Sequence, residues 1–212
     1  MALPPALGPD GRPTPTTFFL TVHHALRRDA HRFPAAVRAG VDPAAIAGHW
    51  SRYRAILVGH HEHEDELLFP AMRSAHPELA GVLDELAADH EALDDLLAEA
   101  DAAYAAIAVE AGQAAEVAER LADVVGRHLD REEEHLAPAM ERDGAAGPPP
   151  DAGPRDGFDD PAFQLPWLTD GLDPGLVDVL VDLLPPPLQE AFPGWRATYG
   201  AGPLVAASDA VA

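Results

Sequence analysis

The 212-residue chain lacks cysteine and lysine, and its 14 basic residues, all arginine, face 36 acidic ones. Without cysteine it can form no disulfide, no thiolate zinc site and no cysteine nucleophile. The net charge of −22 would repel nucleic acids and anionic membranes, so we expect neither as a partner. It also lacks a long apolar run and the pattern of a signal peptide. We therefore expect a soluble cytoplasmic protein.

Histidine is abundant instead, and its distribution divides the chain. All 11 histidines lie between His23 and His135, whereas 12 of the 22 prolines follow Asp143. We therefore predict one domain over residues 1–143. Residues 144–212 are predicted to be a Pro-rich linker and a C-terminal extension that docks on this domain.

The extension contains aromatic and apolar residues but no catalytic motif. Its pattern predicts an extended segment over residues 158–168 that docks apolar side chains. A short helix should follow, opened by Asp173 and Pro174 and stopped at Pro185. The end of the chain is predicted to be disordered.

The first 143 residues are predicted to be all-α, because alanine and other strong helix formers dominate. Start and stop signals, such as Gly40 and the pair Asp42-Pro43, divide them into four helices. We place these helices at residues 15–39, 43–74, 77–110 and 113–142. Connections this short make neighbouring helices antiparallel, which predicts an up-down-up-down four-helix bundle.

Each predicted helix carries an apolar stripe with the spacing of a helix that faces the inside of a bundle. A few polar residues interrupt these stripes, and they are the informative positions. They are His23 in the first helix, His60 and Glu64 in the second, His90 in the third, and His128 and Glu132 in the fourth. A histidine and a glutamate four residues apart lie about one turn apart on the same helix face.

The informative positions repeat along the chain. Residues 60–72 align without a gap on residues 128–140, and the segment around His23 pairs with the segment around His90. Two helical hairpins therefore present the same groups in the same order. The alternative, in which each His–Glu pair is a solvated ion pair on a surface, is less consistent with this duplication.

Carboxylates in a helical core cost several kcal/mol unless they are paired or bound to a metal. The stripes offer no arginine opposite the glutamates, whereas carboxylates and neutral imidazoles are ready ligands for a cation. Four imidazoles and two carboxylates are too many for a four-coordinate zinc site. They suit two metal ions bridged by carboxylates, with iron or manganese as the natural occupants.

The repeated motif resembles the hemerythrin-like (HHE cation-binding) domain, and the resemblance covers about residues 15–142. Ferritin-like di-iron bundles use the reverse order, Glu-x-x-His. The resemblance implies a non-haem di-iron centre inside the bundle, bridged by two carboxylates and an oxo or hydroxo group. The implied ligands are His23, His60, His90 and His128 as terminal groups, Glu64 and Glu132 as bridges, and His61 as a provisional fifth imidazole.

Members of this family bind O2 reversibly, react with peroxide or nitric oxide, or sense iron and oxygen. We therefore expect a peroxide or small diatomic ligand and redox or gas-handling chemistry, with peroxidase- or catalase-like activity among the candidates. The alternatives are a non-catalytic iron- or oxygen-responsive module that signals through the C-terminal tail, and a metal-free scaffold. The sequence identifies no redox or protein partner.

The chain departs from the oxygen-carrying hemerythrins at two places. Those proteins have a further histidine where this chain has Asp94, and their last carboxylate lies five residues after its histidine, whereas Glu132 lies four after His128. We therefore do not expect a dedicated oxygen carrier.

Several aromatic and imidazole side chains are expected to serve other roles. His135 shares a stripe, but its repeat counterpart is Leu67, so we expect it beside the site rather than as a ligand. Trp50 and Tyr53 should pack in the core, where Tyr53 could also line an access channel. The other histidines lie off the stripes and are expected at the surface: His24, His31, His49, His63 and His76.

Overall fold

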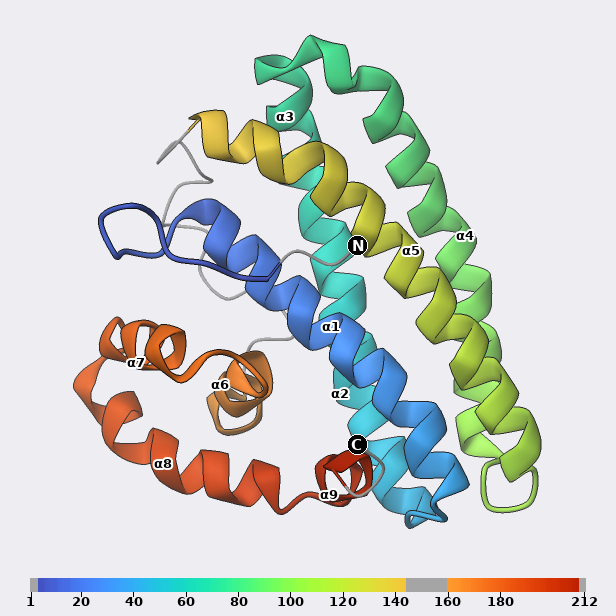
Figure 1. Ribbon diagram of the computed structural model, residues 1–212. Coiled ribbons are helices and arrows are strands. Elements are labelled where there is room, and N and C mark those ends of the chain that lie inside the picture. The colour runs from blue at the N-terminus through green and yellow to red at the C-terminus, as the bar shows by residue number, and fades with distance from the viewer. Residues whose placement is uncertain (1–3, 144–159, 210–212) are drawn as a thin grey trace.

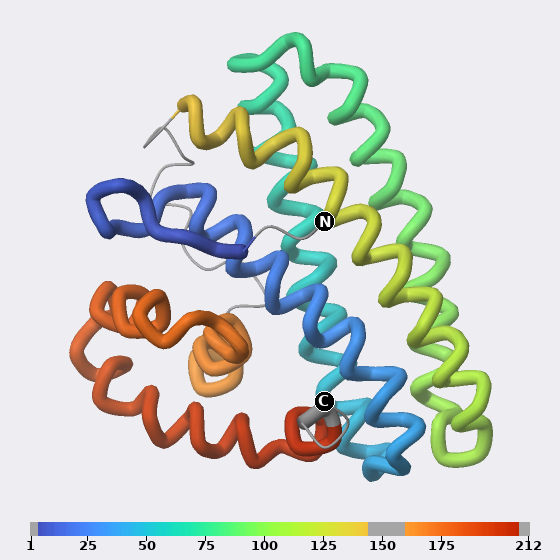
Figure 2. Tube along the Cα trace, viewed as in Figure 1, coloured from blue at the N-terminus to red at the C-terminus, as the bar shows by residue number. Residues whose placement is uncertain are grey.

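The computed structural model describes residues 4–143 and 160–209, and every regular element in these two ranges is helical (Figures 1 and 2). The predicted all-α class is therefore confirmed. Residues 144–159, which include nearly all of the predicted Pro-rich linker, lie outside the described residues, as do both chain ends. None of the described helices is both long enough and apolar enough to cross a membrane.

Four long helical stretches occupy the first 143 residues. They are α1 (Pro15–Arg38); α2 (Pro43–His63), continued by the π-helix η1 (Glu64–Leu68) and α3 (Phe69–Ala75); the 3-10 helix η2 (Pro77–Leu79), continued by α4 (Ala80–Ala105); and α5 (Ala111–Asp143). These bounds agree with the predicted helices to within about two residues, except that the third stretch ends at Ala105 rather than residue 110.

The local signals in the sequence explain where α1 and α2 begin and end. The side chains of Thr14 and Thr17 each accept a hydrogen bond from the other's backbone N–H, which forms a capping box. Gly40 follows α1 with a φ of +69°, a left-handed conformation that glycine adopts without strain. Asp42 caps α2 and Pro43 occupies its first turn, where no backbone N–H is needed.

The long stretches pack around a core that has two separate apolar clusters. α1 and α4 both lie against α5, and α2 contacts α1 and α4 (Figure 1). The larger cluster joins all four stretches and includes Phe33, Trp50, Tyr53, Leu97 and Leu121. The smaller cluster consists of Phe19, Leu20, Phe69, Met72, Leu83, Leu86, Leu136, Ala139 and Met140.

A polar layer separates these clusters. On α1, Phe19 belongs to the smaller cluster and Leu26 to the larger, and His23 lies between them. His90 on α4 lies between the two clusters in the same order, and Glu132 on α5 lies between them in the reverse order along the chain. The candidate ligands therefore form one buried layer across the helices, with apolar side chains on both sides.

The C-terminal extension contains more helix than the sequence predicted. Its elements are α6 (Pro161–Thr169), α7 (Pro174–Asp182), α8 (Pro186–Gly200) and α9 (Pro203–Asp209). The expected extended segment and disordered end are therefore wrong wherever these residues are described. Each helix begins at a proline, which fits a first turn because its missing N–H is not needed there. Of these four starts, we predicted only the one at Pro174 from the sequence.

The extension packs against α1 through a buried polar network. Asp29 of α1 is fully buried, and one of its oxygens lies 2.8 Å from the indole nitrogen of Trp167 in α6 and 2.6 Å from a ring nitrogen of His49 in α2. Its other oxygen lies 2.8 Å from Arg28 and 3.2 Å from Arg32. Burial alone would raise the pKa of Asp29, but these charged partners hold it below its usual value. The expectation that His49 lies at the surface is wrong, because Asp29 holds it inside.

We predict that Asp29→Ala destabilises the protein by about 3–5 kcal/mol, because removing one partner leaves the other buried groups unpaired. Denaturant-induced unfolding of the full chain measures this loss. The matched control is Asp123→Ala, which removes an exposed helical aspartate and should change stability by less than about 0.5 kcal/mol. Equal effects of the two substitutions would show that the network contributes little.

Candidate metal centre

The structure brings all seven predicted ligands together in the polar layer. Their ligand atoms form three overlapping groups, and within each group the atoms lie within 4.8 Å of one another. The groups are His61, His90 and His128; His23, His60, Glu64 and Glu132; and Glu64, His90, His128 and Glu132. Both glutamates belong to two of the three groups, so the imidazoles are arranged around the carboxylates.

Glu64 and Glu132 are the unusual residues of this layer. Their side chains are 1% and 0% exposed, and none of their four oxygens has a hydrogen-bond partner among the described residues. Burial raises the pKa of both carboxyl groups well above the usual 4.5, and their mutual repulsion raises that of Glu64 further. Two buried acids without partners are costly in a folded protein unless something else binds them.

Imidazoles from different helices face these carboxylates. Within each repeat, Nε2 of His60 lies 3.4 Å from Glu64 and Nε2 of His128 lies 3.3 Å from Glu132. Across the helices, Nε2 of His23 lies 3.6 Å from Glu132 and 4.0 Å from Glu64. The glutamate of each hairpin is therefore also within reach of imidazoles from other helices.

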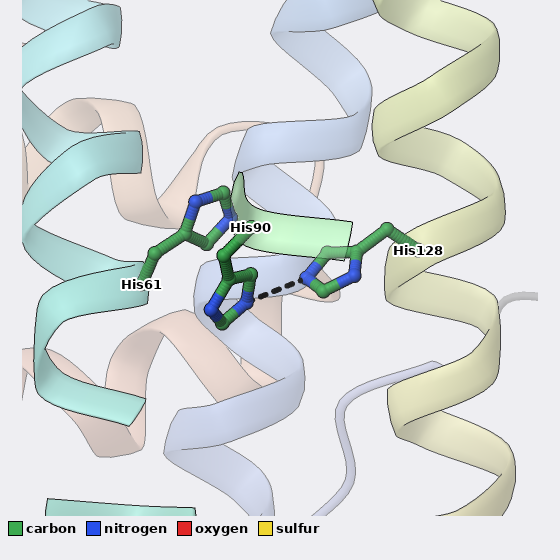
Figure 3. A group of neighbouring side chains, drawn as sticks. All are labelled: His61, His90 and His128. Atoms are coloured by element: carbon green, nitrogen blue, oxygen red, sulfur yellow. Dashed lines mark hydrogen bonds between the residues drawn. The ribbon is translucent and has the colours of Figure 1, made fainter. Parts of the chain in front are cut away.

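The three histidines of the first group point toward one another (Figure 3). The rings of His61 and His90 stack at 4.1 Å between centroids, and the His128 ring stands edge-on to His61 at 5.3 Å. Nε2 of His90 lies 3.1 Å from Nε2 of His128. His61, which the sequence left as a provisional ligand, therefore lies beside two of the firmer candidates.

All five imidazoles are held in the neutral form that binds metals. Burial lowers the pKa of His23, His60, His61, His90 and His128, and repulsion from neighbouring imidazoles adds to the effect in most of them. The pKa of His128 falls to about 2. Neutral imidazole is the form in which histidine ligates a metal.

Two further carboxylates orient imidazoles, and our sequence reasoning missed them. Oε1 of Glu133 lies 3.2 Å from Nδ1 of His23, and both oxygens of Asp65 lie 3.0 Å from Nδ1 of His90. Each such contact holds the proton on Nδ1 and leaves Nε2 unprotonated, which is the form that can bind a metal. The repeat contained the signal, because Asp65 and Glu133 occupy equivalent positions directly after the two buried glutamates.

Arginines at the edge of the layer stabilise the outer carboxylates. Arg27 lies 3.0 Å from Glu133, and Arg131 lies 2.6 Å from Asp89. Asp89 in turn lies 3.7 Å from Nδ1 of His128. Positive charge therefore stays outside the ligand layer, where it pairs with Glu133 and Asp89 rather than with Glu64 or Glu132.

The two hairpins differ in backbone at one place. Glu64 is the first residue of the π-helix η1, which ends shortly before Pro70, whereas α5 continues without interruption through Pro138. A π-helical turn accommodates an extra residue, and such turns are frequent at functional sites. The two halves of the repeat therefore share a sequence motif but differ in backbone next to the buried glutamate.

The remaining candidates lie outside the ligand layer. His135 is partly buried and belongs to none of the three groups found among the described residues, and Asp94 is exposed. His31 is exposed as predicted, whereas His76 is buried, with Nε2 at 2.8 Å from Asp143, so its predicted surface position is wrong. Trp50 and Tyr53 pack in the larger apolar cluster, as expected.

The residues of the layer fit a bound cation. Beyond the four carboxylate oxygens, Nε2 of His23, His60 and His61 are buried and have no hydrogen-bond partner among the described residues. A cation would satisfy these oxygens and nitrogens together, and it would stabilise the ionised form of both carboxyl groups. An apolar ligand would leave them unsatisfied.

Comparison with known proteins agrees with this geometry. The family model of the hemerythrin HHE cation binding domain matches residues 14–140, which is more than half of the chain. No curated protein and no solved structure matches the chain. The family match indicates a cation-binding domain, and the His/Glu groups are the described residues that could hold the metal.

We predict that metal binding releases protons and strengthens as the pH rises. In the metal-free protein the carboxyl groups of Glu64 and Glu132 stay protonated above pH 4.5, up to their raised pKa, whereas the imidazoles are already neutral. Below that pKa, if binding of one ion releases one proton, the apparent affinity for the metal rises about tenfold for each unit of pH increase. Titration calorimetry with Mn²⁺ in two buffers of different ionisation enthalpy counts the protons. Identical heats in both buffers would contradict the prediction.

Proposed function

The chain belongs to the hemerythrin family of HHE cation-binding domains, and on that premise we propose that it is a non-haem di-iron protein with redox or gas-handling activity. In this proposal the four long helical stretches form an antiparallel up-down-up-down bundle. The two metal ions lie in the polar layer between the two apolar clusters. Iron is the expected metal, and manganese is the alternative.

The observation that carries the proposal is the pair of buried glutamates whose four oxygens have no partner among the described residues. Five neutral imidazoles surround Glu64 and Glu132, which gives seven ligand groups in one layer. Seven groups exceed what a single four-coordinate ion takes, whereas two ions that share both carboxylates would use all of them. Imidazole with carboxylate favours iron over calcium or magnesium, which prefer oxygen ligands.

The overlapping groups support an unequal division of the ligands. His23 and His60 would hold one ion, and His61, His90 and His128 would hold the other, with Glu64 and Glu132 shared between them. The ion with two imidazoles has fewer protein ligands, so we assign the small ligand to it. Bound iron would supply one-electron redox chemistry and a position for peroxide, O2 or nitric oxide.

The protein's own side chains would hold this centre in place and keep it dry. The Phe19 ring lies 3.9 Å from the His23 ring between centroids, and the Phe69 ring lies 5.5 Å from that of His90. Both phenylalanines belong to the smaller apolar cluster, which closes one side of the layer. Exclusion of water there strengthens the electrostatic contacts inside the layer. We propose peroxidase- or catalase-like turnover, or reaction with O2 or nitric oxide, in the cytoplasm.

We predict two iron ions per chain in the iron-loaded protein, and loss of at least one of them in His60→Ala and in Glu132→Gln. Each substitution removes a ligand that no neighbouring group replaces. Metal analysis of the purified, iron-reconstituted chains measures the ratio. The control is His31→Ala, an exposed histidine of α1, which should leave the ratio unchanged. An unchanged ratio in both ligand variants would rule out the assigned centre.

A second candidate function is iron or oxygen sensing, in which metal loading is communicated to the C-terminal extension. The observation that favours it is the double role of α1. His23 lies in the ligand layer, and the neighbouring His24 has its Nε2 3.2 Å from the backbone oxygen of Asp170, between α6 and α7. One turn later, Arg28 donates to the same oxygen at 2.6 Å. A metal that fixes α1 would therefore also stabilise the docked extension.

If the protein is a sensor, tryptic cleavage after Arg196 in α8 should be several-fold slower in the iron-loaded form than in the metal-free form. The reason is that cleavage needs local opening of the extension, which docking on α1 suppresses. Mass spectrometry of a digestion time course measures both rates. Asp29→Ala, which breaks the docking network, should remove the difference. Equal rates in the two forms of the unmodified protein would exclude the sensing function.

A further inference from the structure

Four aromatic side chains form a continuous group in the larger apolar cluster. The Trp50 ring lies 4.8 Å from the ring of Tyr104 and 5.8 Å from that of Tyr53, and the latter pair is stacked. Phe33 lies 5.3 Å from Tyr53 and 5.6 Å from Trp50. All four are buried, with exposed fractions of 4% or less. Three of these rings, an indole and two phenols, can be oxidised by one electron.

The group begins close to the ligand layer. Tyr53 lies seven residues before His60 on α2, which is two helical turns, or about 10 Å along the helix axis. Residues at this spacing share a helix face. Trp50, about one turn before Tyr53 on α2, stacks on Tyr53 on the side away from the layer. The aromatic rings therefore lead from the ligand layer toward the far end of the larger cluster.

Among these four aromatic side chains, the Trp50 indole is the one whose N–H has a hydrogen-bond acceptor that could take its proton. The hydroxyl groups of Tyr53 and Tyr104 are buried and have no hydrogen-bond partner among the described residues. Trp50 differs, because its Nε1–H donates a 2.8 Å hydrogen bond to Oδ1 of Asp101 on α4. The Asp101 side chain is 44% exposed and forms an ion pair with Arg54. One end of the aromatic group thus connects to a carboxylate in contact with solvent.

Proton acceptors decide which ring gives up an electron. An oxidised phenol is a very strong acid, so a tyrosine that cannot release its proton is hard to oxidise. An oxidised indole also becomes acidic, and Trp50 can pass its proton along an existing hydrogen bond. Trp167 offers a comparison within the same chain, because its indole donates a 2.8 Å hydrogen bond to Asp29. The Arg28 guanidinium, 5.9 Å from the Trp167 ring, opposes the development of positive charge there.

We propose that Trp50 is the residue through which electrons enter the metal centre during peroxide reduction, with Tyr53 between them and Asp101 as the proton acceptor. This inference rests on the proposed function. It assigns to Trp50 and Asp101 a role beyond core packing and beyond the hydrogen bond that a buried indole needs.

Hydrogen peroxide takes up two electrons and two protons and yields two water molecules. Each electron leaves the Trp50 indole for the centre, and the Nε1 proton moves to Oδ1 of Asp101, which leaves a neutral indolyl radical. A one-electron reductant of the ascorbate class then returns an electron to the indole, and Asp101 returns the proton. Two such cycles consume one peroxide, and the two protons for water come from the reductant through solvent.

The test adds hydrogen peroxide to the iron-loaded full chain without a reductant. Rapid freezing and electron paramagnetic resonance should show a tryptophan radical, which Trp50→Phe abolishes. Peptide mass spectrometry should then find oxidation mainly at Trp50, although Trp195 is more exposed. In a second sample, the same iron and peroxide are added to a variant that lacks metal-binding side chains, so that the iron stays in solution. Oxidation should then occur mainly at Trp195 instead of Trp50, because freely diffusing oxidants attack exposed side chains. Trp167 should stay unmodified in both samples.

Further variants separate electron transfer from packing. Asp101→Asn keeps an acceptor for the indole hydrogen bond but removes the base, so it should lower the radical yield while leaving iron content and folding unchanged. Tyr53→Phe keeps a ring and should change the radical yield little.

If peroxide is consumed but Trp50 is neither a radical nor preferentially oxidised, the inference is wrong and the proposed function stands. If iron is bound but peroxide is not consumed, peroxide reduction itself fails, and the inference fails with it.

Discussion

The constraint on which the rest of the structure depends is the burial of two glutamates in an apolar core. Glu64 and Glu132 come from different hairpins, lie in the same layer and have four oxygens without partners among the described residues. Five imidazoles whose burial keeps them neutral surround these carboxylates, and the nearby arginines bind outer carboxylates instead. Without a cation the layer would be a large destabilising defect in a protein whose net stability is expected to be small. The fold is therefore best understood as a scaffold that holds ligand atoms in an arrangement only a metal satisfies.

The surrounding structure supports this layer from three sides. Apolar clusters pack above and below it, so water is kept from the carboxylates while the helices gain ordinary core packing. Carboxylates placed directly after each buried glutamate orient an imidazole on another helix, which ties the two hairpins together through the site. The C-terminal helices then pack on α1 around Asp29, six residues beyond His23. One helix thus links the ligand layer, the docked extension and, through Phe33, the aromatic group near Trp50.

The sequence predicted the parts of this arrangement that depend on local or repeated signals. Caps at Thr14 and Asp42 set helix starts, and the apolar stripes with the duplicated motif identified six of the seven residues that the structure brings into one layer. The seventh, His61, came from the family resemblance as a provisional ligand. Contacts between distant segments could not be predicted in this way, because helical periodicity places a residue on a face but does not show what packs there. His49 was expected at the surface because its partner Asp29 lies on another helix, and the role of Trp167 needs a helix that the proline-rich tail concealed. Asp65 and Glu133 occupy equivalent places in the repeat, but they lie off the apolar stripes, so helical periodicity alone did not identify them.

The most direct test of the central claim is a crystal structure of the iron-loaded chain with anomalous diffraction recorded on both sides of the iron absorption edge. The account predicts two iron peaks in the polar layer. One should lie next to His23 and His60, the other next to His61, His90 and His128, and both should contact Glu64 and Glu132. A single peak, or an iron-free layer in which Glu64 and Glu132 turn toward solvent, would contradict it.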